Sequence, residues 1–196
     1  MTIEFFPGSN KNERTPMQSE RMREEDARLR AMFDDKLKAF REKKKSMESH
    51  PFSELKNGMT ATKTIQVTQD DIMFFAIASG DLNPLHVDEE FAKSTKLKGT
   101  VMHGVYSAAI ISELLGTLKP GVGTIFKELH IKFDNPLRPG DTVEAYVTVA
   151  EIGEKGDVTF DVGTKVNGKN IVTGTALVKA PREAAVLGKQ ELKDVA

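Results

Sequence analysis

The sequence predicts an α+β fold in which an antiparallel β-sheet wraps a long central helix. Residues 105–116 are apolar nearly all round and include several small side chains, a composition typical of a buried helix. After residue 121, short segments of alternating apolar and polar residues follow one another, which is typical of antiparallel strands. One buried helix followed by a run of strands is the arrangement of an α+β domain.

The composition changes near residue 52, and we therefore divide the chain into three segments. Residues 1–51 form a densely charged extension whose apolar residues recur at helical spacing. This spacing predicts an amphipathic helix over residues 19–45, which we expect to pack on the domain or on a partner subunit. Residues 52–180 form the expected folded domain, and residues 181–196 a flexible C-terminal tail. The apolar positions of the predicted helix are Met22, Leu29, Phe33, Leu37 and Phe40.

The sequence of the first part of the domain predicts a strand followed by two helices. Residues 60–67 alternate in polarity and are expected to form the strand. Thr68 and Asp71 match a capping box, which predicts a helix that continues to about residue 79. Asp88 is placed to cap a second, short helix that ends near residue 95.

Four strands are expected after the central helix. Apolar residues share one face over residues 129–133, 143–149 and 158–162, and residues 171–178 are expected to complete a hairpin with the third of these segments. Asn167-Gly168, between the last two segments, is a strong signal for a two-residue hairpin turn. The sequence therefore predicts that these strands pair in an antiparallel sheet.

The composition argues against several classes of function. The chain has 28 Lys and Arg against 29 Asp and Glu, a formal net charge of -1, so no bulk attraction to nucleic acid or membranes is expected. It has no cysteine, which excludes disulfides and a thiol nucleophile and fits a reducing compartment. The longest apolar run contains Glu113 and is too short to span a membrane. We therefore expect a cytoplasmic protein that neither binds nucleic acid nor inserts into membranes. Because its four histidines are scattered along the sequence, we also expect no metal site.

The most informative motif is the string Ser-Gly-Asp-Leu-Asn-Pro-Leu-His at residues 79–86. Asp81 and His86 provide a carboxylate and an imidazole, the side chains best suited to handle a water molecule near neutral pH. His86 is the fifth residue after Asp81, a spacing that matches neither one face of a helix nor one face of a strand. The two side chains converge only if the chain bends between them, and Asn83-Pro84 favours such a bend.

With its surroundings, this motif resembles the signature of the MaoC-like hydratases, which include the (R)-specific enoyl-CoA hydratases. The resemblance covers about residues 55–180. It implies a hot dog fold, an acyl-CoA substrate and a homodimer or dimer-based oligomer, with no cofactor because CoA is part of the substrate. The N-terminal extension lies outside the family pattern, and Thr100 stands where the family often has proline. The other strings that carry the resemblance are His103-Gly104, residues 112–116 and residues 138–141.

The resemblance implies reversible hydration of trans-2-enoyl-CoA to (R)-3-hydroxyacyl-CoA. Asp81 and His86 would hold one water; one of them would remove its proton while the other orients it and returns a proton to Cα. The N–H of Gly104, at the start of the buried helix, would stabilise the oxyanion that develops on the thioester. Asn83 and Ser112 match positions that support the site, holding the loop and the water.

Other functions stay open at this point. A 3-hydroxyacyl-[acyl carrier protein] dehydratase would use the same chemistry on another carrier. A non-catalytic hot dog domain that binds acyl groups, or scaffolds a complex through its helical extension, would need neither Asp81 nor His86. A hot dog thioesterase is disfavoured because the motif is that of the hydratases. His103 is expected to orient the loop rather than to take part in catalysis.

Overall fold

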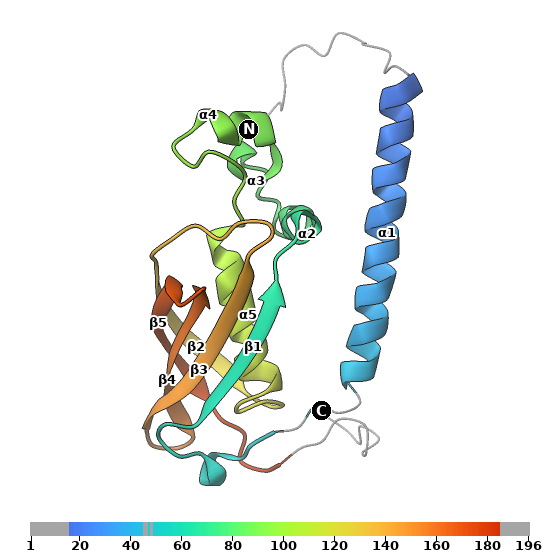
Figure 1. Cartoon of the computed structure of the whole chain (residues 1–196). Coiled ribbons are helices and arrows are strands. Elements are labelled where there is room, and N and C mark those ends of the chain that lie inside the picture. Colours follow the sequence, from blue (N-terminus) through green and yellow to red (C-terminus); the bar gives the residue numbers. More distant parts are fainter. Residues whose placement is uncertain (1–15, 45–46, 48, 185–196) are drawn as a thin grey trace, which may run out of the picture. The chain divides into compact units, whose positions relative to one another are not determined.

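A computed structural model describes residues 16–44, 47 and 49–184 of the chain (Figure 1). The chain divides after Glu42 into two compact units, which we describe separately. The predicted boundary between extension and domain, near residue 52, lies ten residues further on. The predicted C-terminal tail falls mostly on residues 185–196, outside the described residues.

The first unit is dominated by one long helix, α1, which spans Pro16–Lys44. This confirms the helical extension that the apolar spacing predicts. Proline is favoured at the first position of a helix, because its missing N–H has no intrahelical partner there. Phe33 and Phe40, two members of the predicted apolar stripe, are exposed. No helix within the described part of the chain, α1 included, is long and apolar enough to cross a membrane.

The second unit is built on a five-stranded antiparallel sheet (Figure 1). The strands pair in the order β1-β3-β4-β5-β2, so β1 and β2 lie at the two edges. Asn167 and Gly168 have φ values of 50° and 77° and join β4 to β5, as expected for a two-residue turn with both residues left-handed. The strands are β1 (Thr60–Gln66), β2 (Ile125–Phe133), β3 (Thr142–Ile152), β4 (Asp157–Val166) and β5 (Lys169–Lys179).

A 3-10 turn at Phe52–Glu54 precedes β1, and three short helices connect β1 to the central helix. The first, α2, spans Gln69–Ser79 and begins with the predicted capping box. In this box Thr68 Oγ1 accepts the N–H of Asp71, and the Asp71 carboxylate accepts the N–H of Thr68. The other two helices are α3 (Pro84–Val87) and α4 (Glu89–Ser94).

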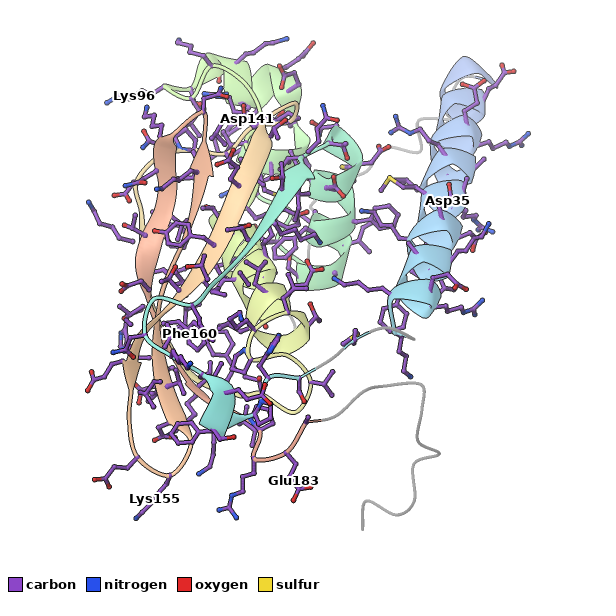
Figure 2. All side chains as sticks on the ribbon, turned by 60° about the horizontal axis from the view of Figure 1, so that its bottom comes forward. Asp35, Lys96, Asp141, Lys155, Phe160 and Glu183 are labelled. Atoms are coloured by element: carbon purple, nitrogen blue, oxygen red, sulfur yellow. The ribbon has the colours of Figure 1, made fainter. Side chains whose placement is uncertain are left out.

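The central helix, α5, spans Gly104–Thr117 and packs on one face of the sheet, where it contacts β1, β2, β3 and β4 (Figure 1). Ile111 and Leu114 on α5 are fully buried, as is Phe160 on β4, which Figure 2 shows within the sheet layer. The expectation that α5 is buried all round is wrong for one face, since Val105 and Ser112 are exposed. The physical reason is that one sheet covers one side of a helix.

Candidate active site

The motif at residues 79–86 folds into a tight turn followed by the one-turn helix α3. Gly80 ends α2 in the left-handed conformation, with φ 74°. The carboxylate of Asp81 then accepts the N–H of Asn83 (3.1 Å), and the side chain of Asn83 accepts the N–H of Leu85 (3.1 Å). Asn83 is thus the N-cap of α3, and Pro84 occupies its first turn. The expected bend between Asp81 and His86 is therefore a capped helical turn.

This turn brings Asp81 and His86 together. The Asp81 Oδ2 atom lies 4.0 Å from His86 Nε2, a separation too long for a hydrogen bond. The His86 side chain is 13% exposed and that of Asp81 is 50% exposed. His86 Nδ1 lies 2.7 Å from the carbonyl oxygen of Val101, which accepts hydrogen bonds and cannot donate them. Nδ1 therefore carries the proton in the neutral ring, and Nε2, the nitrogen that lies 4.0 Å from Asp81 Oδ2, keeps its lone pair.

His103 contacts both members of this pair. It is 2% exposed, and its Nε2 donates to the backbone carbonyl oxygen of Asp81 (2.9 Å). Its ring stacks on that of His86, with 3.8 Å between centroids and 27° between planes, and packs against Phe75. These contacts hold the loop in place, which is the role that the sequence suggests for His103. Its Nδ1 atom is buried and has no hydrogen-bond partner among the described residues.

Asp81, His86 and His103 form a cluster that sequence spacing does not reveal. Each offers one possible ligand atom, and these atoms lie within 4.8 Å of one another. The expectation of scattered histidines was therefore wrong for His86 and His103. One nitrogen of each ring already contacts a backbone carbonyl oxygen, which leaves one nitrogen per ring for any ligand. The absence of a metal ion from the working protein stays a prediction.

A pocket of about 340 Å³ opens beside His86. Gly104 lies on its wall as the first residue of α5, so its N–H is one of the helix donors that have no intrahelical partner. The side chain of His103, the N-cap residue, makes no capping hydrogen bond to these groups. A Cβ atom at Gly104 would lie 3.0 Å from the ring of Phe133, so this site suits glycine. The apolar lining residues are Leu97, Val101, Met102, Phe133, Pro136, Leu137, Ile171 and Val172.

Ser107, rather than the predicted Ser112, lines this pocket. Ser107 is buried and its Oγ lies 3.3 Å from Thr164 Oγ1. Ser112 is on the exposed face of α5, eight residues or about 12 Å along the helix axis from Gly104. Gly104 and Ser107 are three residues apart and so share one helix face, which identifies Ser107 only once the structure has placed Gly104 on the pocket wall.

The fold and the site define an α+β protein with an Asp–His pair at the mouth of an apolar pocket. Residues 52–173, more than half of the chain, match the family model described as MaoC like domain. The chain therefore belongs to the MaoC-like domain family. The resemblance noted in the sequence is thus confirmed.

The matches to two curated relatives extend over most of the length of those proteins. The (R)-specific enoyl-CoA hydratase of Rhodospirillum rubrum is 42% identical over 133 residues, which is 67% of this chain and 92% of that protein. The 3-hydroxybutyryl-CoA dehydratase of Methylorubrum extorquens is 36% identical over 133 residues, which is 67% of this chain and 85% of that protein.

Solved structures confirm the hot dog fold. The R-hydratase PhaJ1 from Pseudomonas aeruginosa superposes with a TM-score of 0.71 at 32% identity, covering 77% of this chain and 98% of that one. The (R)-hydratase from A. caviae gives a TM-score of 0.63 at 34% identity, covering 65% of this chain and 98% of that one.

Proposed function

We propose that this protein catalyses the reversible hydration of trans-2-enoyl-CoA to (R)-3-hydroxyacyl-CoA. It is accordingly an enzyme, a carbon–oxygen lyase. The observation that carries the proposal is the Asp81–His86 pair, 4.0 Å apart, beside a pocket whose wall also contains Gly104. The relatives named for enoyl-CoA hydration and for 3-hydroxybutyryl-CoA dehydration support the same reaction.

The geometry of the pair fits one bound water. We place one water molecule against both the Asp81 carboxylate and His86 Nε2, because at 4.0 Å these two groups are too far apart to hydrogen-bond each other directly. In the neutral tautomer that the Val101 carbonyl selects, Nε2 accepts a proton from this water. The water oxygen then bonds to Cβ of the enoyl group, and the proton on Nε2 passes to Cα. Asp81 orients the water and stabilises the imidazolium while it carries this proton.

The N–H of Gly104 serves the third requirement of the reaction. As the double bond is attacked, negative charge develops on the thioester oxygen. The first N–H groups of α5 lack intrahelical partners, and the helix dipole favours negative charge at this end. One donor of this kind contributes about 3–4 kcal/mol at a transition state.

Activity on crotonyl-CoA tests the proposal directly. Loss of the enoyl-thioester absorbance reports hydration, and chiral chromatography of the product reports its configuration. We expect Asp81→Asn and His86→Gln each to lower kcat by about 100- to 10,000-fold, the usual contribution of a positioned acid–base group. His130→Gln is the matched control, since His130 is an exposed histidine on β2 whose side chain is 77% exposed. Failure of the unaltered protein to hydrate enoyl-CoA of any chain length would contradict the proposal, as would full activity in Asp81→Asn.

CoA is the carrier that we propose, and the comparison of carriers needs its own measurement. The two relatives described above are named for CoA substrates. We expect crotonyl-CoA to be hydrated with a higher kcat/KM than crotonyl-[acyl carrier protein] under identical conditions. A higher value for the carrier-protein thioester would assign the enzyme to fatty acid synthesis instead.

We further propose that the working protein is a homodimer that pairs through β2. This strand ends the order of the sheet, so its outer edge has no neighbouring strand among the described residues. Ile125, Phe126 and Phe133 on β2 are exposed, and a sheet edge with exposed apolar side chains favours pairing with another copy. We expect light scattering to give the mass of a dimer and Ile125→Lys/Phe126→Lys to shift it toward the monomer. A monomeric mass for the unaltered protein would refute the dimer.

The proposed reaction needs no cofactor, because water and the enoyl thioester contain all the atoms of the product. We expect prolonged treatment with a chelator to leave kcat unchanged. A loss of activity that added metal restores would show that the cluster of Asp81, His86 and His103 binds an ion. A cytoplasmic location likewise stays a proposal, which fractionation of the source cells tests.

A further inference from the structure

A second pocket is lined by residues of the same segment that lines the active-site pocket. Leu97 and Val101 line the active-site pocket. The residues between them, 98–100, line a pocket of about 370 Å³ together with Gln69, Glu89, Arg138 and Pro139. Residues 97–101 therefore contribute to both an apolar pocket and a polar one.

Two cationic residues, Lys98 and Arg138, line the polar pocket, and Lys96 lies two residues before Lys98 in the chain. Lys93, Lys96 and Lys98 follow one another with no acidic residue between them. Lys93 pairs with Glu89 at 3.3 Å, so these two charges balance. Within residues 16–44, 47 and 49–184, no ion pair engages Lys96 or Lys98. The Arg138 guanidinium lines the pocket and donates to a backbone carbonyl oxygen rather than to a carboxylate.

The backbone holds Lys98 in a conformation that lysine rarely adopts. Its φ is 60°, in the left-handed region, and its N–H donates to the carbonyl oxygen of Thr95 (3.3 Å). On the far side of Gly99, the N–H of Thr100 donates to the Glu89 carboxylate (3.0 Å), which lowers the pKa of Glu89 and keeps it ionised. Left-handed residues other than glycine are uncommon and gather at functional sites. The loop therefore presents the Lys98 side chain from a conformation that the fold imposes.

We propose that Lys96 and Lys98, together with Arg138, bind the phosphate groups of CoA while the acyl chain occupies the apolar pocket. This inference rests on the proposed hydratase function. An acyl-CoA has an apolar acyl chain at one end of its thioester arm and a nucleotide with a diphosphate and a ribose phosphate at the other. Arginine binds phosphate through its planar fork, and lysine binds it as a point charge. The apolar pocket and the cations, to both of which residues 97–101 contribute, match these two ends.

The test compares two thioesters with the same reacting group. Crotonyl-CoA carries the phosphates, and crotonyl-pantetheine lacks them. For Lys96→Gln/Lys98→Gln we expect KM for crotonyl-CoA to rise about tenfold, since each exposed charge contact contributes modestly. KM for crotonyl-pantetheine should not rise, because this substrate has no group for the lysines to bind. Raising the ionic strength should raise KM for crotonyl-CoA in the unaltered protein. The KM values of the unaltered protein and the double variant should therefore become more similar at high salt.

Lys155→Gln is the matched control. Lys155 is also an exposed lysine with a left-handed backbone, at φ 55°, and it lies in the turn between β3 and β4. Figure 2 shows Lys155 and Lys96 at opposite ends of the second unit. We expect this variant to match the unaltered protein on both thioesters. An equal rise in KM for both substrates in the double variant, or a rise with Lys155→Gln, overturns the proposal.

Calorimetry with free CoA separates this inference from the hydratase function. CoA binding needs no reaction, so it is measured even for a protein that hydrates nothing. We expect weaker binding of CoA to the double variant than to the unaltered protein and to Lys155→Gln. Equal affinity in all three proteins overturns the phosphate site even if hydration is shown. Conversely, weaker binding in the double variant supports the site even if no enoyl thioester is hydrated.

Discussion

The contact between His86 Nδ1 and the Val101 carbonyl oxygen determines what this imidazole offers to a substrate. At 2.7 Å the carbonyl oxygen accepts the Nδ1 proton, so the neutral ring has a free lone pair on Nε2. His103 makes the corresponding contact through Nε2, to the backbone of Asp81. The two stacked rings therefore have different tasks, since the ring of His86 faces the pocket and that of His103 holds the loop.

His103→Phe separates these tasks. Phenylalanine keeps the stacking with His86 but loses the donor to the Asp81 carbonyl oxygen. We expect kcat for crotonyl-CoA hydration to fall about tenfold, because a lost hydrogen bond of about 1–1.5 kcal/mol loosens the loop that carries Asp81. The free energy of unfolding should fall by less than the lost hydrogen bond alone would cost, since the variant also removes a buried nitrogen atom that has no hydrogen-bond partner among the described residues. His103→Gln, which retains a donor, should recover part of kcat, and full activity in His103→Phe would refute a positioning role.

The environment of Tyr106, on α5, leads us to expect that the folded protein loses stability at alkaline pH. Burial raises its pKa to about 12, and the negative charges of Asp71 and Glu113 add to this shift. The folded protein therefore keeps the phenol proton at pH values where the unfolded chain, with a pKa of about 10.0, has lost it. The unfolded state then binds fewer protons, so stability is full below pH 10 and falls as pH rises from about 10 toward 12.

Urea unfolding gives the free energy of unfolding at about pH 8 and about pH 11, below and above the pKa of tyrosine in the unfolded chain. The difference between the two values measures this fall in stability. We expect Tyr106→Phe to lose less stability between the two pH values than the unaltered protein. The chain has two tyrosines and no tryptophan, so in Tyr146→Phe the phenolate absorbance reports Tyr106 without interference. A midpoint near 10 in that variant would show that the phenol is not buried in the folded protein.

At the scale of elements, the capping box of α2 connects local sequence to the site, because α2 leads into the loop of Asp81. Thr68→Ala removes the acceptor for the N–H of Asp71. We expect a loss of about 1 kcal/mol, the usual cost of an N-cap, and a drop in Tm of about 2–4 °C. Thr68→Ser keeps the acceptor and is the control for thermal unfolding. An unchanged Tm in Thr68→Ala would mean that the box adds nothing to the folded protein.

Features that depend on neighbouring residues are those that the sequence predicts well. The capping box of α2 and the Asn167-Gly168 turn each arise from the residues that form them, and the structure contains both. The short helix α3 was expected as a bend, because a turn of four residues leaves no periodic pattern to recognise. The Asp81–His86 approach follows from that local turn.

Features that depend on packing between distant elements are those that the sequence does not predict. The stacking of His103 on His86 joins the N-cap of α5 to α3 across seventeen positions of chain, and no spacing rule anticipates it. The choice of Ser107 over Ser112 depends on which face of α5 meets the sheet. An apolar helix gives no such direction by itself, because all its faces look alike in sequence.

At the scale of the whole molecule, the division after Glu42 predicts that the second unit works without the first. Residues 81–107 and 133–172 supply the site, and the buried core belongs to the second unit. We expect a variant that begins at Lys43 to keep the far-ultraviolet circular dichroism of an α+β domain and a kcat within about twofold of the full chain, a change of less than 0.5 kcal/mol in the barrier.

The same variant also tests what α1 contributes to assembly. Phe33 and Phe40 expose apolar surface on this helix, which we expect to pack against another surface when the protein assembles. Light scattering and KM for crotonyl-CoA therefore accompany the rate measurement. A smaller assembly with unchanged KM would place α1 between subunits, whereas a higher KM with unchanged assembly would place it at the substrate entrance. A folded variant without activity would refute the independence of the second unit, because its Asp81, His86 and Gly104 are all present.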